Sequence, residues 1–439
     1  MNEQPSLFNA AKAVLEANDQ GNYTVPAPGL YPHQWLWDSC FIAIGQRHYD
    51  VQRAQTEITH LLTGQWSNGM LPNMIMSHDK HARDGNIWLS WVNPHAPDHI
   101  NTSGITQPPV IAEAVYKIGQ KLSLPERRTW FKTVYPALLK YHEWLHNERD
   151  PHNEGLTLQI HPWETGLDNT PPWMRELKDH QMPLWIQVVE KLRLDKVIAL
   201  FRRDTKLIPA EQRLSTLEAL AFFSTQRRLR RKQYDIGRIL THALFSIEDL
   251  TFNCILIRAD KVLCDMAKTI KKEIPEDLRN RMKKTEDALE QLWDPYSSQY
   301  YSRNFVTHTL IKEPSIAALM PLYAGCITQE RANVLVKQLE NKHLYGPAYP
   351  VPSVAVNSDW FKPTGYWQGP TWVNTNWLII EGLRQNGFKD HAEALRESTL
   401  EMVAQAGFRE YFNPLNGEPA GAENFSWTAA LTIDLLQNS

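Results

Sequence analysis

The sequence is poor in the features that mark several large classes of protein. Only four of its 439 residues are cysteines, Cys40, Cys254, Cys264 and Cys326, and none of them forms a C-x-x-C pair. A disulfide framework or a zinc site is therefore not expected, and we interpret all four as buried thiols. No stretch approaches the ~20 apolar residues of a membrane span, and the amino-terminal stretch lacks a signal-peptide pattern. These absences favour a cytoplasmic protein without a membrane partner.

An excess of positive charge is also missing. The formal net charge is -3, with 46 lysines and arginines against 49 aspartates and glutamates. Binding to nucleic acid or to an anionic membrane requires a basic face, so neither is expected as a partner. Residues 227–232 form a basic run, which is most often a solvated helix face; phosphate binding is the less favoured alternative.

Aromatic residues, by contrast, are abundant and unusually placed. The chain has 16 tryptophans and 15 tyrosines, and many of them stand beside Gly, Pro, Asn or Asp rather than at helical spacing. Core packing explains aromatics at helical spacing, whereas aromatics in loops are typical of binding clefts. Because their flat faces stack on sugar rings, this placement indicates a carbohydrate-binding cleft and a small carbohydrate as the partner.

Helical periodicity recurs from end to end, while strand-like alternation is nearly absent. The expected helices cover residues 6–18, 38–48, 50–63, 107–120, 126–147, 184–201, 211–228, 247–268, 276–293, 314–324, 328–340, 371–386, 389–405 and 426–437. Long loops rich in Pro, Gly, Asn and Trp separate many of them. We therefore predict an all-α fold, an α/α toroid whose inner and outer rings of helices enclose one pocket. A helical solenoid is the competing arrangement, disfavoured because no repeat is visible.

No Pro- or Ser-rich linker divides the chain, so residues 1–439 are expected to form a single catalytic domain. The stretch 174–235 differs in composition from the rest of the chain, because it is rich in charged residues and leucine and has few residues typical of loops. We expect it to form a helical excursion over the mouth of the pocket.

Hydrolysis of a glycosidic bond requires one carboxylic acid and one carboxylate, so acids in aromatic-rich loops are the candidates. Asp168 follows Trp163 and Gly166 in such a loop. Burial beside Trp163 and Trp173 would raise its pKa and keep a proton available at neutral pH. The alternative is that Asp168 caps the helix that begins at the following prolines.

Three further acids meet the same description. Glu410 and Glu423 lie in one glycine-punctuated loop before the last helix, and spacing alone does not separate them. Asp38 comes directly after Trp35 and Trp37 and is suited to accept hydrogen bonds from a pair of sugar hydroxyls. The competing interpretation of Asp38 is a helix N-cap.

Six blocks of the sequence resemble glycoside hydrolase family 63, which has an (α/α)6 barrel and is related to the trehalases of family 37. They run in family order from Trp35 to Phe41, Asn68 to Pro72, Thr102 to Pro109, Gly166 to Asn169, Tyr366 to Trp372, and Glu410 to Gly417 with Asn424 to Ala429. The resemblance implies an inverting enzyme with Asp168 as general acid and Glu410 as general base. Inversion places the two carboxyls about 6.5–9.5 Å apart with a water between Glu410 and the anomeric carbon.

The resemblance also implies which groups hold the sugar, and it implies no metal or organic cofactor. Asp38 and Gln107 are expected to bind hydroxyls, with tryptophans as walls. The candidate substrate-binding residues are Trp35, Trp37, Asp38, Gln107, Trp163, Gly166, Tyr366, Trp367, Gln368, Trp372 and Arg213.

In length the chain is most similar to the compact bacterial hydrolases of mannosylglycerate and glucosylglycerate. Such a substrate carries a carboxylate, for which an arginine and tyrosine pair is expected. Arg213 lies in the matching stretch, but Ala219 stands where the tyrosine is expected and Gln368 where an arginine is. A 2-O-α-glycosylglycerate is therefore the leading substrate, with an α-glucosidase of kojibiose, nigerose or trehalose as the alternative. A sugar-binding protein without turnover is the alternative from another class.

Overall fold

Helices make up most of the chain in the computed structural model, which describes residues 6–77, 82–180, 183–199, 202, 204–241 and 246–438. Six helices pack each against the next and close into an inner ring, because the last of them, α18, also lies against α2. They are α2 (Leu36–Gln46), α5 (Ile111–Gln120), α12 (Leu250–Ile270), α14 (Pro321–Ala324), α16 (Val373–Gln385) and α18 (Ser426–Gln437).

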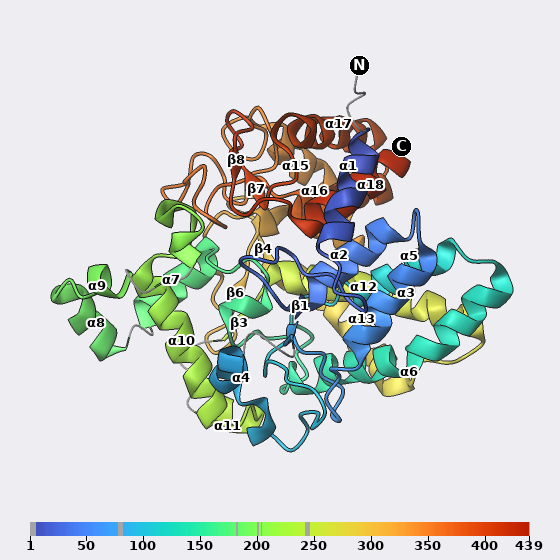
Figure 1. Ribbon diagram of the computed structural model, residues 1–439, viewed down its shortest axis with the longest axis horizontal. Coiled ribbons are helices and arrows are strands. Elements are labelled where there is room, and N and C mark those ends of the chain that lie inside the picture. Colours follow the sequence, from blue (N-terminus) through green and yellow to red (C-terminus); the bar gives the residue numbers. More distant parts are fainter. Residues whose placement is uncertain are drawn as a thin grey trace.

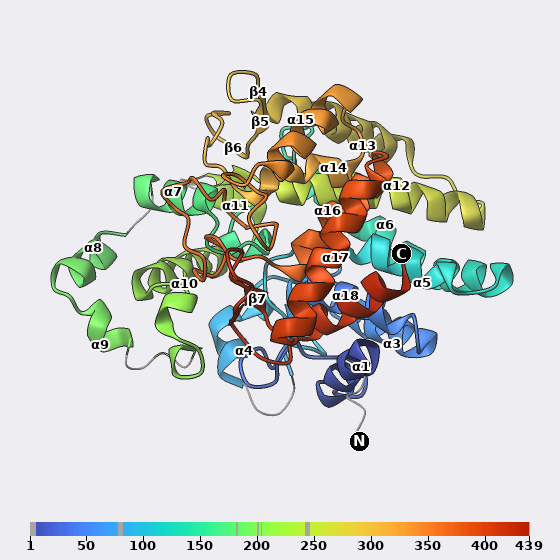
Figure 2. The ribbon, with the colours of Figure 1, turned by 90° about the horizontal axis from the view of Figure 1, so that it is seen from above.

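Six more helices form an outer ring around the first. Each packs against one or two inner helices. They are α1 (Leu7–Ala17), α3 (Val51–Leu62), α6 (Leu124–Glu148), α13 (Glu276–Ala288), α15 (Gln329–Glu340) and α17 (Lys389–Ala406). Because the inner ring closes, the predicted (α/α)6 barrel is confirmed, and the solenoid interpretation is wrong. Figures 1 and 2 show the first and last helices, α1 and α18, side by side.

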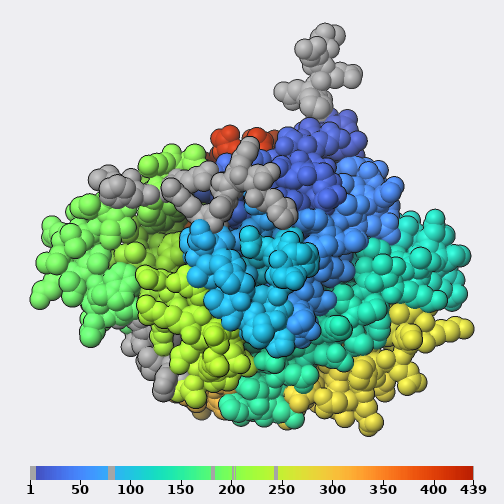
Figure 3. Space-filling model, turned by 60° about the horizontal axis from the view of Figure 1, so that its bottom comes forward, coloured from blue at the N-terminus to red at the C-terminus, as the bar shows by residue number. Residues whose placement is uncertain are grey.

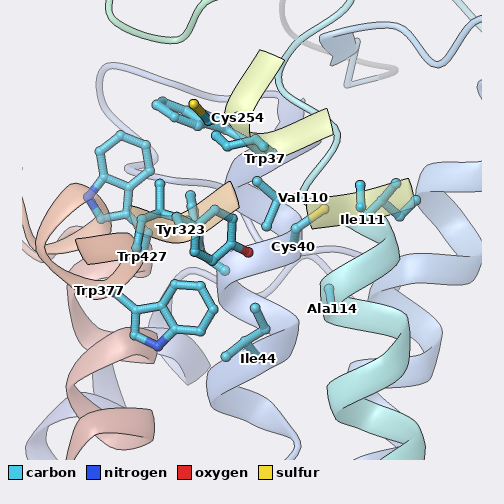
Figure 4. Packing of buried hydrophobic residues seen from close by; sticks show 14 of the residues in the cluster. Trp37, Cys40, Ile44, Val110, Ile111, Ala114, Cys254, Tyr323, Trp377 and Trp427 are labelled. Atoms are coloured by element: carbon cyan, nitrogen blue, oxygen red, sulfur yellow. The ribbon is translucent and has the colours of Figure 1, made fainter. Parts of the chain in front are cut away.

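The difference between the rings follows from the sequence of each helix. All eleven residues of α2 are buried, and α18 is buried from Ser426 to Leu435, as expected for helices that are apolar on every side. Outer helices such as α3 bury only one face. The two inner helices α2 and α18 approach closely at Gly45, where a side-chain carbon would lie 2.4 Å from the carbonyl oxygen of Ala430. Figure 4 shows Trp37, Trp377 and Trp427 packed in this core.

A buried carboxylate links three elements of the inner ring. Asp434 on α18 accepts hydrogen bonds from His48 at 2.8 Å and from Trp377 Nε1 at 2.8 Å, and it pairs with Arg47 at 2.7 Å. Hydrogen bonds and opposite charges hold the pKa of Asp434 below its usual range despite burial. The cluster therefore fixes α18 against α2 and α16 by charge as well as by packing.

Strands are few and short, as the sequence indicates. In the described residues they pair as four antiparallel two-stranded sheets. The pairs are β1 (Gln34–Trp35) with β2 (Met74–Ile75), β3 (Ile247–Glu248) with β6 (Arg303–Asn304), β4 (Trp293–Asp294) with β5 (Gln299–Tyr300), and β7 (Tyr411–Phe412) with β8 (Pro419–Ala420). Two of these strands adjoin the cavity described below: β1 contains Trp35, and β7 directly follows Glu410.

The stretch 174–235 leaves the barrel as a run of helices, apart from Gln181, Met182, Leu200, Phe201 and Arg203, which lie outside the described residues. The helices here and just beyond are α7 (Pro171–His180), α8 (Leu184–Lys191), α9 (Asp195–Ala199), α10 (Thr216–Arg231) and α11 (Ile236–Leu240). They project from one side of the barrel in Figures 1 and 2 and form the green and yellow-green surface in Figure 3. The single helix expected over 184–201 is wrong, because α8 and α9 are separate.

Two details of the sequence analysis need correction. Cys40 and Cys254 are buried, but Cys264 and Cys326 are partly exposed, so not all thiols are buried. A short helix, α4 (Ala82–Trp88), lies in a stretch expected to be loop. No helix of the described residues is long and apolar enough to cross a membrane.

Candidate active site

A cavity of about 560 Å³ opens where the amino-terminal ends of several inner helices converge. Asp38 in the first turn of α2, Gln107 before α5, Trp372 before α16 and Trp427 at the start of α18 all line it. The other lining residues are Pro26, Gly29, Leu30, Tyr31, Pro32, Trp35, Trp37, Trp163, Gly166, Asp168, Ile198, Arg202, Asp204, Arg213, Leu214, Thr216, Ala219, Leu220, Phe223, Tyr366, Trp367, Glu410 and Phe425. Loops between distant helices thus meet at one end of the barrel.

Tryptophans form much of the cavity wall. Trp367 and Trp372 stack with ring centroids 3.7 Å apart and planes 2° from parallel, and Trp372 packs in turn on Tyr411 at 4.5 Å. Trp37 meets Trp427 edge to face at 5.5 Å. Such packing fixes the rings, so that they present rigid apolar faces to whatever occupies the cavity.

Asp168 lies in the loop that leads into α7, three residues before that helix begins at Pro171. Its carboxyl reaches the cavity and accepts a hydrogen bond from Tyr366 Oη at 2.9 Å. Burial in the cavity wall raises the pKa of Asp168 to about 7, against the opposing effects of the Tyr366 hydrogen bond and the Arg213 charge. The side chain therefore keeps a proton near neutral pH, and a function in the cavity is favoured over a helix cap.

Glycine at position 166 is what allows this loop to close on the core. Gly166 has φ +73°, and a side-chain carbon there would lie 2.4 Å from the Trp37 ring. Any other residue would displace Trp37 or push the loop outward. The close approach brings Asp168 and the Trp37 wall to the same cavity.

Glu410 precedes β7 and is 1% exposed. Its Oε1 accepts hydrogen bonds from Tyr31 Oη at 2.8 Å and from Arg213 Nη1 at 3.2 Å. Its Oε2 accepts one from the Ala422 backbone N–H at 2.9 Å. Gly421 is required next to it, because at φ +71° a side-chain carbon would lie 2.7 Å from Glu410 Oε2. The carboxylate is held firmly on the cavity wall.

The two acids that spacing did not separate have different surroundings. The Glu423 side chain is 69% exposed and pairs with Arg409 at 2.7 Å. Glu423 does not line the cavity, whereas Glu410 does. The geometry thus separates a cavity carboxylate from a surface one.

Asp38 is a third carboxyl in the cavity. The helix α2 begins after Trp35, so Asp38 lies in its first turn and is not the N-cap. Burial raises the pKa of Asp38 well above its usual range, and the negative charges of Glu410 and Asp168 raise it further. The carboxyl is available to polar groups of a ligand.

Arg213 and Tyr31 lie between the residues around Glu410 and those around Asp168. The Arg213 guanidinium lies 4.4 Å from the centre of the Tyr366 ring and 5.5 Å from that of Tyr31. Sequence reasoning missed Tyr31, although it lies in the aromatic loop just before Trp35. It also missed two neighbours on the excursion, Arg202 and Asp204, which line the cavity.

Two expected neighbours of the site lie elsewhere. Gln368 is not among the residues that line the cavity; it borders a second cavity, where its amide donates to the Asn169 carbonyl at 3.0 Å and accepts from Lys362 Nζ at 3.1 Å. Trp173 packs in a separate apolar cluster under α10. In the described part of the chain, no group of His, Cys, Asp and Glu side chains is placed to hold a metal ion.

A helical toroid in which Asp168, with its raised pKa, and the carboxylate of Glu410 face one aromatic-walled cavity defines the class of the protein, which is a glycoside hydrolase. The chain belongs to the family of the mannosylglycerate hydrolase MGH1-like glycoside hydrolase domain, whose model matches residues 31–428. The resemblance to glycoside hydrolase family 63 is thereby confirmed.

Relatives match over nearly the whole chain. The mannosylglycerate hydrolase of Rubrobacter radiotolerans is 35% identical over 98% of this chain and 96% of its own length. The glucosylglycerate hydrolase of Mycolicibacterium hassiacum is 30% identical over 98% and 97%. The crystal structure of the family 63 mannosylglycerate hydrolase from Thermus thermophilus, in complex with Tris and D-glycerate, has a TM-score of 0.86 at 36% identity and covers 98% of this chain and 99% of that one.

Proposed function

We propose that this enzyme hydrolyses a 2-O-α-glycosylglycerate with inversion, with Asp168 as the general acid and Glu410 as the general base. The observation that carries the proposal is the contrast between two carboxyls of one cavity. Asp168 has a pKa of about 7 and so holds a proton in part of the molecules at neutral pH, while Glu410 is fixed by Tyr31, Arg213 and the Ala422 N–H. Environments that differ in this way assign acid and base roles.

The proposed reaction is a single displacement. Asp168 donates its proton to the glycosidic oxygen, and the bond between that oxygen and the anomeric carbon breaks. A water attacks the anomeric carbon from the opposite face and transfers a proton to Glu410. The products are the β-anomer of the sugar and free glycerate, and no metal or cofactor takes part.

The sugar is proposed to lie between the aromatic walls. Trp35, Trp37, Trp163, Trp367 and Trp372 would contact its apolar faces, and Asp38 and Gln107 would bind its hydroxyls. Support comes from their shared place in the lining of the cavity. Gly166 and Tyr366 act on Asp168, the first by admitting the loop and the second by its hydrogen bond.

The leaving group is proposed to meet Arg213, whose guanidinium fits a carboxylate with two parallel hydrogen bonds. The names of the relatives support a glycerate leaving group, and the related Thermus enzyme has been crystallised with D-glycerate. Ala219 adds no hydroxyl to this part of the wall, which continues in Leu220 and Phe223. Carboxylate recognition would therefore depend chiefly on Arg213.

We further propose that the excursion 174–235 covers the pocket within a single catalytic domain. Its described residues Ile198, Arg202, Asp204, Arg213 and those of the first turns of α10 line one side of the cavity. Gln212 ties it to the barrel, because its carbonyl accepts a hydrogen bond from Tyr411 and its side chain one from the Gly421 N–H at 3.0 Å.

The test is sugar release from a panel of substrates. Purified protein is incubated with 2-O-α-mannosylglycerate, 2-O-α-glucosylglycerate, kojibiose, nigerose and trehalose, and the anomer of the product is followed by NMR at early times. Matched glycosylglycerols, which carry a hydroxymethyl group in place of the carboxylate, serve as controls. We expect β-anomer from a glycosylglycerate and much slower release from its glycerol counterpart.

Three results would contradict the proposal. Release from a disaccharide alone would make the enzyme an α-glucosidase with a changed leaving-group site. Early α-anomer would exclude inversion. No release from any substrate, with ligand still bound, would favour a sugar-binding protein.

The pH profile tests Asp168 separately. A general acid acts only while protonated, so kcat/KM is expected to fall as the pH rises through about 7. The Tyr366 hydrogen bond lowers the pKa of Asp168, so Tyr366→Phe is expected to move this alkaline limb to higher pH. The maximal rate should fall by less than about tenfold, as for one hydrogen bond.

The matched control is Tyr135→Phe, because the buried Tyr135 hydroxyl on α6 lies outside the cavity and has no hydrogen-bond partner in the described part of the chain. This variant should keep the wild-type profile. An alkaline limb that stays in place or moves to lower pH in Tyr366→Phe would contradict the assignment of Asp168.

A further inference from the structure

The carboxylate of Glu410 has little acceptor capacity left. An ionised carboxylate offers about two lone-pair positions on each oxygen. On Oε1 both are taken, by Tyr31 Oη at 2.8 Å and Arg213 Nη1 at 3.2 Å. On Oε2 the Ala422 N–H lies at 2.9 Å and the same Arg213 nitrogen at 3.5 Å. A base must accept a hydrogen bond from the attacking water, and this arrangement leaves no clear position on Oε1 for it.

Of the three donors, Arg213 is the one that is able to leave. The Ala422 N–H belongs to the backbone of the loop beside β8, and Tyr31 precedes β1, so both are parts of the barrel. Arg213 belongs to the excursion instead and reaches Glu410 through a long side chain. Departure of Arg213 alone would open a lone pair of Oε1 while Tyr31 still orients the carboxylate.

The guanidinium lies against the rings of Tyr366 and Tyr31, but its hydrogen bonding is incomplete. Its Nε is buried and has no hydrogen-bond partner among the described residues. The acid on its other side, Asp204, lies 3.9 Å from that nitrogen and is already held by Arg202 at 2.5 and 3.1 Å. Arg213 thus contacts Glu410 through one nitrogen, Nη1, and keeps an unused donor, Nε, inside the cavity, where a second carboxylate would find it.

We propose that Arg213 is an autoinhibitory switch: it blocks the base Glu410 until the carboxylate of the leaving group draws the guanidinium away. The proposal rests on the function proposed above and adds a regulation of the same site. A carboxylate that engages Nε and one Nη forms two parallel hydrogen bonds, which are stronger and better oriented than the present contacts of Nη1 alone. A ligand shifts an equilibrium by its differential affinity for the two states, and this ligand binds only the state in which Glu410 is free.

The switch predicts how the enzyme would discriminate among substrates. A neutral leaving group leaves Arg213 on Glu410, so the bound sugar meets a base whose Oε1 has no clear position for water. The penalty then appears in kcat rather than only in KM, because the missing interaction acts on the chemical step. A carboxylate that merely anchored the substrate would instead act mostly through KM.

Glycosyl fluorides test the action of the base alone, because their hydrolysis needs neither a general acid nor a glycerate leaving group. In an α-glycosyl fluoride the carbon–fluorine bond breaks and fluoride departs without a proton, while water forms the new bond to carbon and gives its proton to Glu410. Fluoride is small, so the space for glycerate stays open. The experiment measures fluoride release from α-mannosyl and α-glucosyl fluoride by the wild-type enzyme, with increasing D-glycerate or, as a control, glycerol.

We expect D-glycerate to raise kcat for the fluoride saturably, by at least about fivefold, the lower end of usual coupling between ligands. Glycerol, which lacks the carboxylate, should have no effect. In Arg213→Met, the block on Glu410 is removed, so fluoride release without glycerate should exceed that of the wild type and should not respond to glycerate. The same variant should lose 10²-fold or more in kcat/KM for a glycosylglycerate, about the effect of losing a charged hydrogen-bonded pair.

A second variant separates the switch from general effects of removing an arginine. Arg409 lies in the same loop as Glu410 but pairs with the exposed Glu423. Arg409→Met should therefore keep the full response to glycerate. Arg213→Lys keeps the charge without two parallel donors and should respond only weakly.

The outcomes distinguish the switch from the function. If glycosylglycerates are cleaved but D-glycerate fails to stimulate, or inhibits, fluoride release by the wild-type enzyme, the switch is wrong and the function stands. A loss of fluoride release in Arg213→Met would also overturn it, because Arg213 would then support the base. If glycerate stimulates fluoride release but no glycosylglycerate is cleaved, the substrate assignment fails while the switch stands.

Discussion

Asp168→Asn is expected to lower kcat for a glycosylglycerate by 10²-fold or more. The amide is nearly the same size as the carboxyl and still accepts a hydrogen bond from Tyr366, so the loop should keep its conformation. What is lost is the proton that burial keeps on Asp168 near neutral pH. Removal of a general acid typically costs 10²- to 10⁴-fold, because the leaving oxygen must depart as an alkoxide.

Two substrates make this prediction specific to the acid. Glycerate leaves slowly without protonation, whereas fluoride leaves without it. Fluoride release from an α-glycosyl fluoride should therefore fall by less than about tenfold in Asp168→Asn. Thermal unfolding, followed by circular dichroism, checks that the variant is folded. Equal losses on both substrates would contradict the role of Asp168 as the acid.

The barrel was predictable because its signal is local. Helices of the inner ring, such as α2 and α18, are apolar on every side, and those of the outer ring have one apolar face. These patterns follow from the sequence of each segment alone. Ring closure was an inference from the number of helices and the pattern of loops between them, and the packing of α18 on α2 confirms it.

The excursion was the least predictable part of the fold. Its helices are held by few buried side chains; α8 buries only Ile186, and α9 has no buried residue. With so little burial, periodicity does not fix where α8 ends, and one helix was expected where two lie. The short helix α4 was missed for a similar reason, because seven residues carry barely two turns of pattern.

The contacts within the site were harder to predict from the sequence than the fold. The block around Asp168 was identified from its own residues, but its partner Tyr366 lies 198 residues away. The contacts of Glu410 with Tyr31 and Arg213 span 379 and 197 residues. Residues so far apart in the chain form no local motif that the sequence would reveal, so Tyr31 was missed. Gln368 was placed at the sugar by resemblance, whereas its amide is turned toward Asn169.

Glu410 and Glu423 illustrate how one turn separates two roles. The loop turns at Gly421, whose positive φ and absent side chain let the chain fold back against Glu410. The Ala422 N–H then meets Glu410 Oε2, while the next residue, Glu423, points outward to Arg409. Both acids lie in the same loop before the last helix, so their positions in the sequence do not distinguish them. The direction of the turn decides which of them is buried.

Glu410→Gln is expected to lower kcat by 10²-fold or more on both glycosylglycerates and glycosyl fluorides. Both reactions need a base to take the proton of the attacking water, and glutamine is too weak a base to do so. The amide retains an oxygen for Tyr31 but places its NH2 group against the Ala422 N–H, so circular dichroism is used to check that the variant is folded. This pattern differs from that of Asp168→Asn, which is expected to affect the two substrates unequally.

Glu423→Gln is the matched control, since it makes the same chemical change thirteen residues further along the same loop. Its side chain is exposed and its ion pair with Arg409 lies at the surface, where such pairs contribute little. Activity on both substrates should stay within about twofold of wild type. A large loss in Glu423→Gln together with a small one in Glu410→Gln would move the base to the other side of the turn at Gly421.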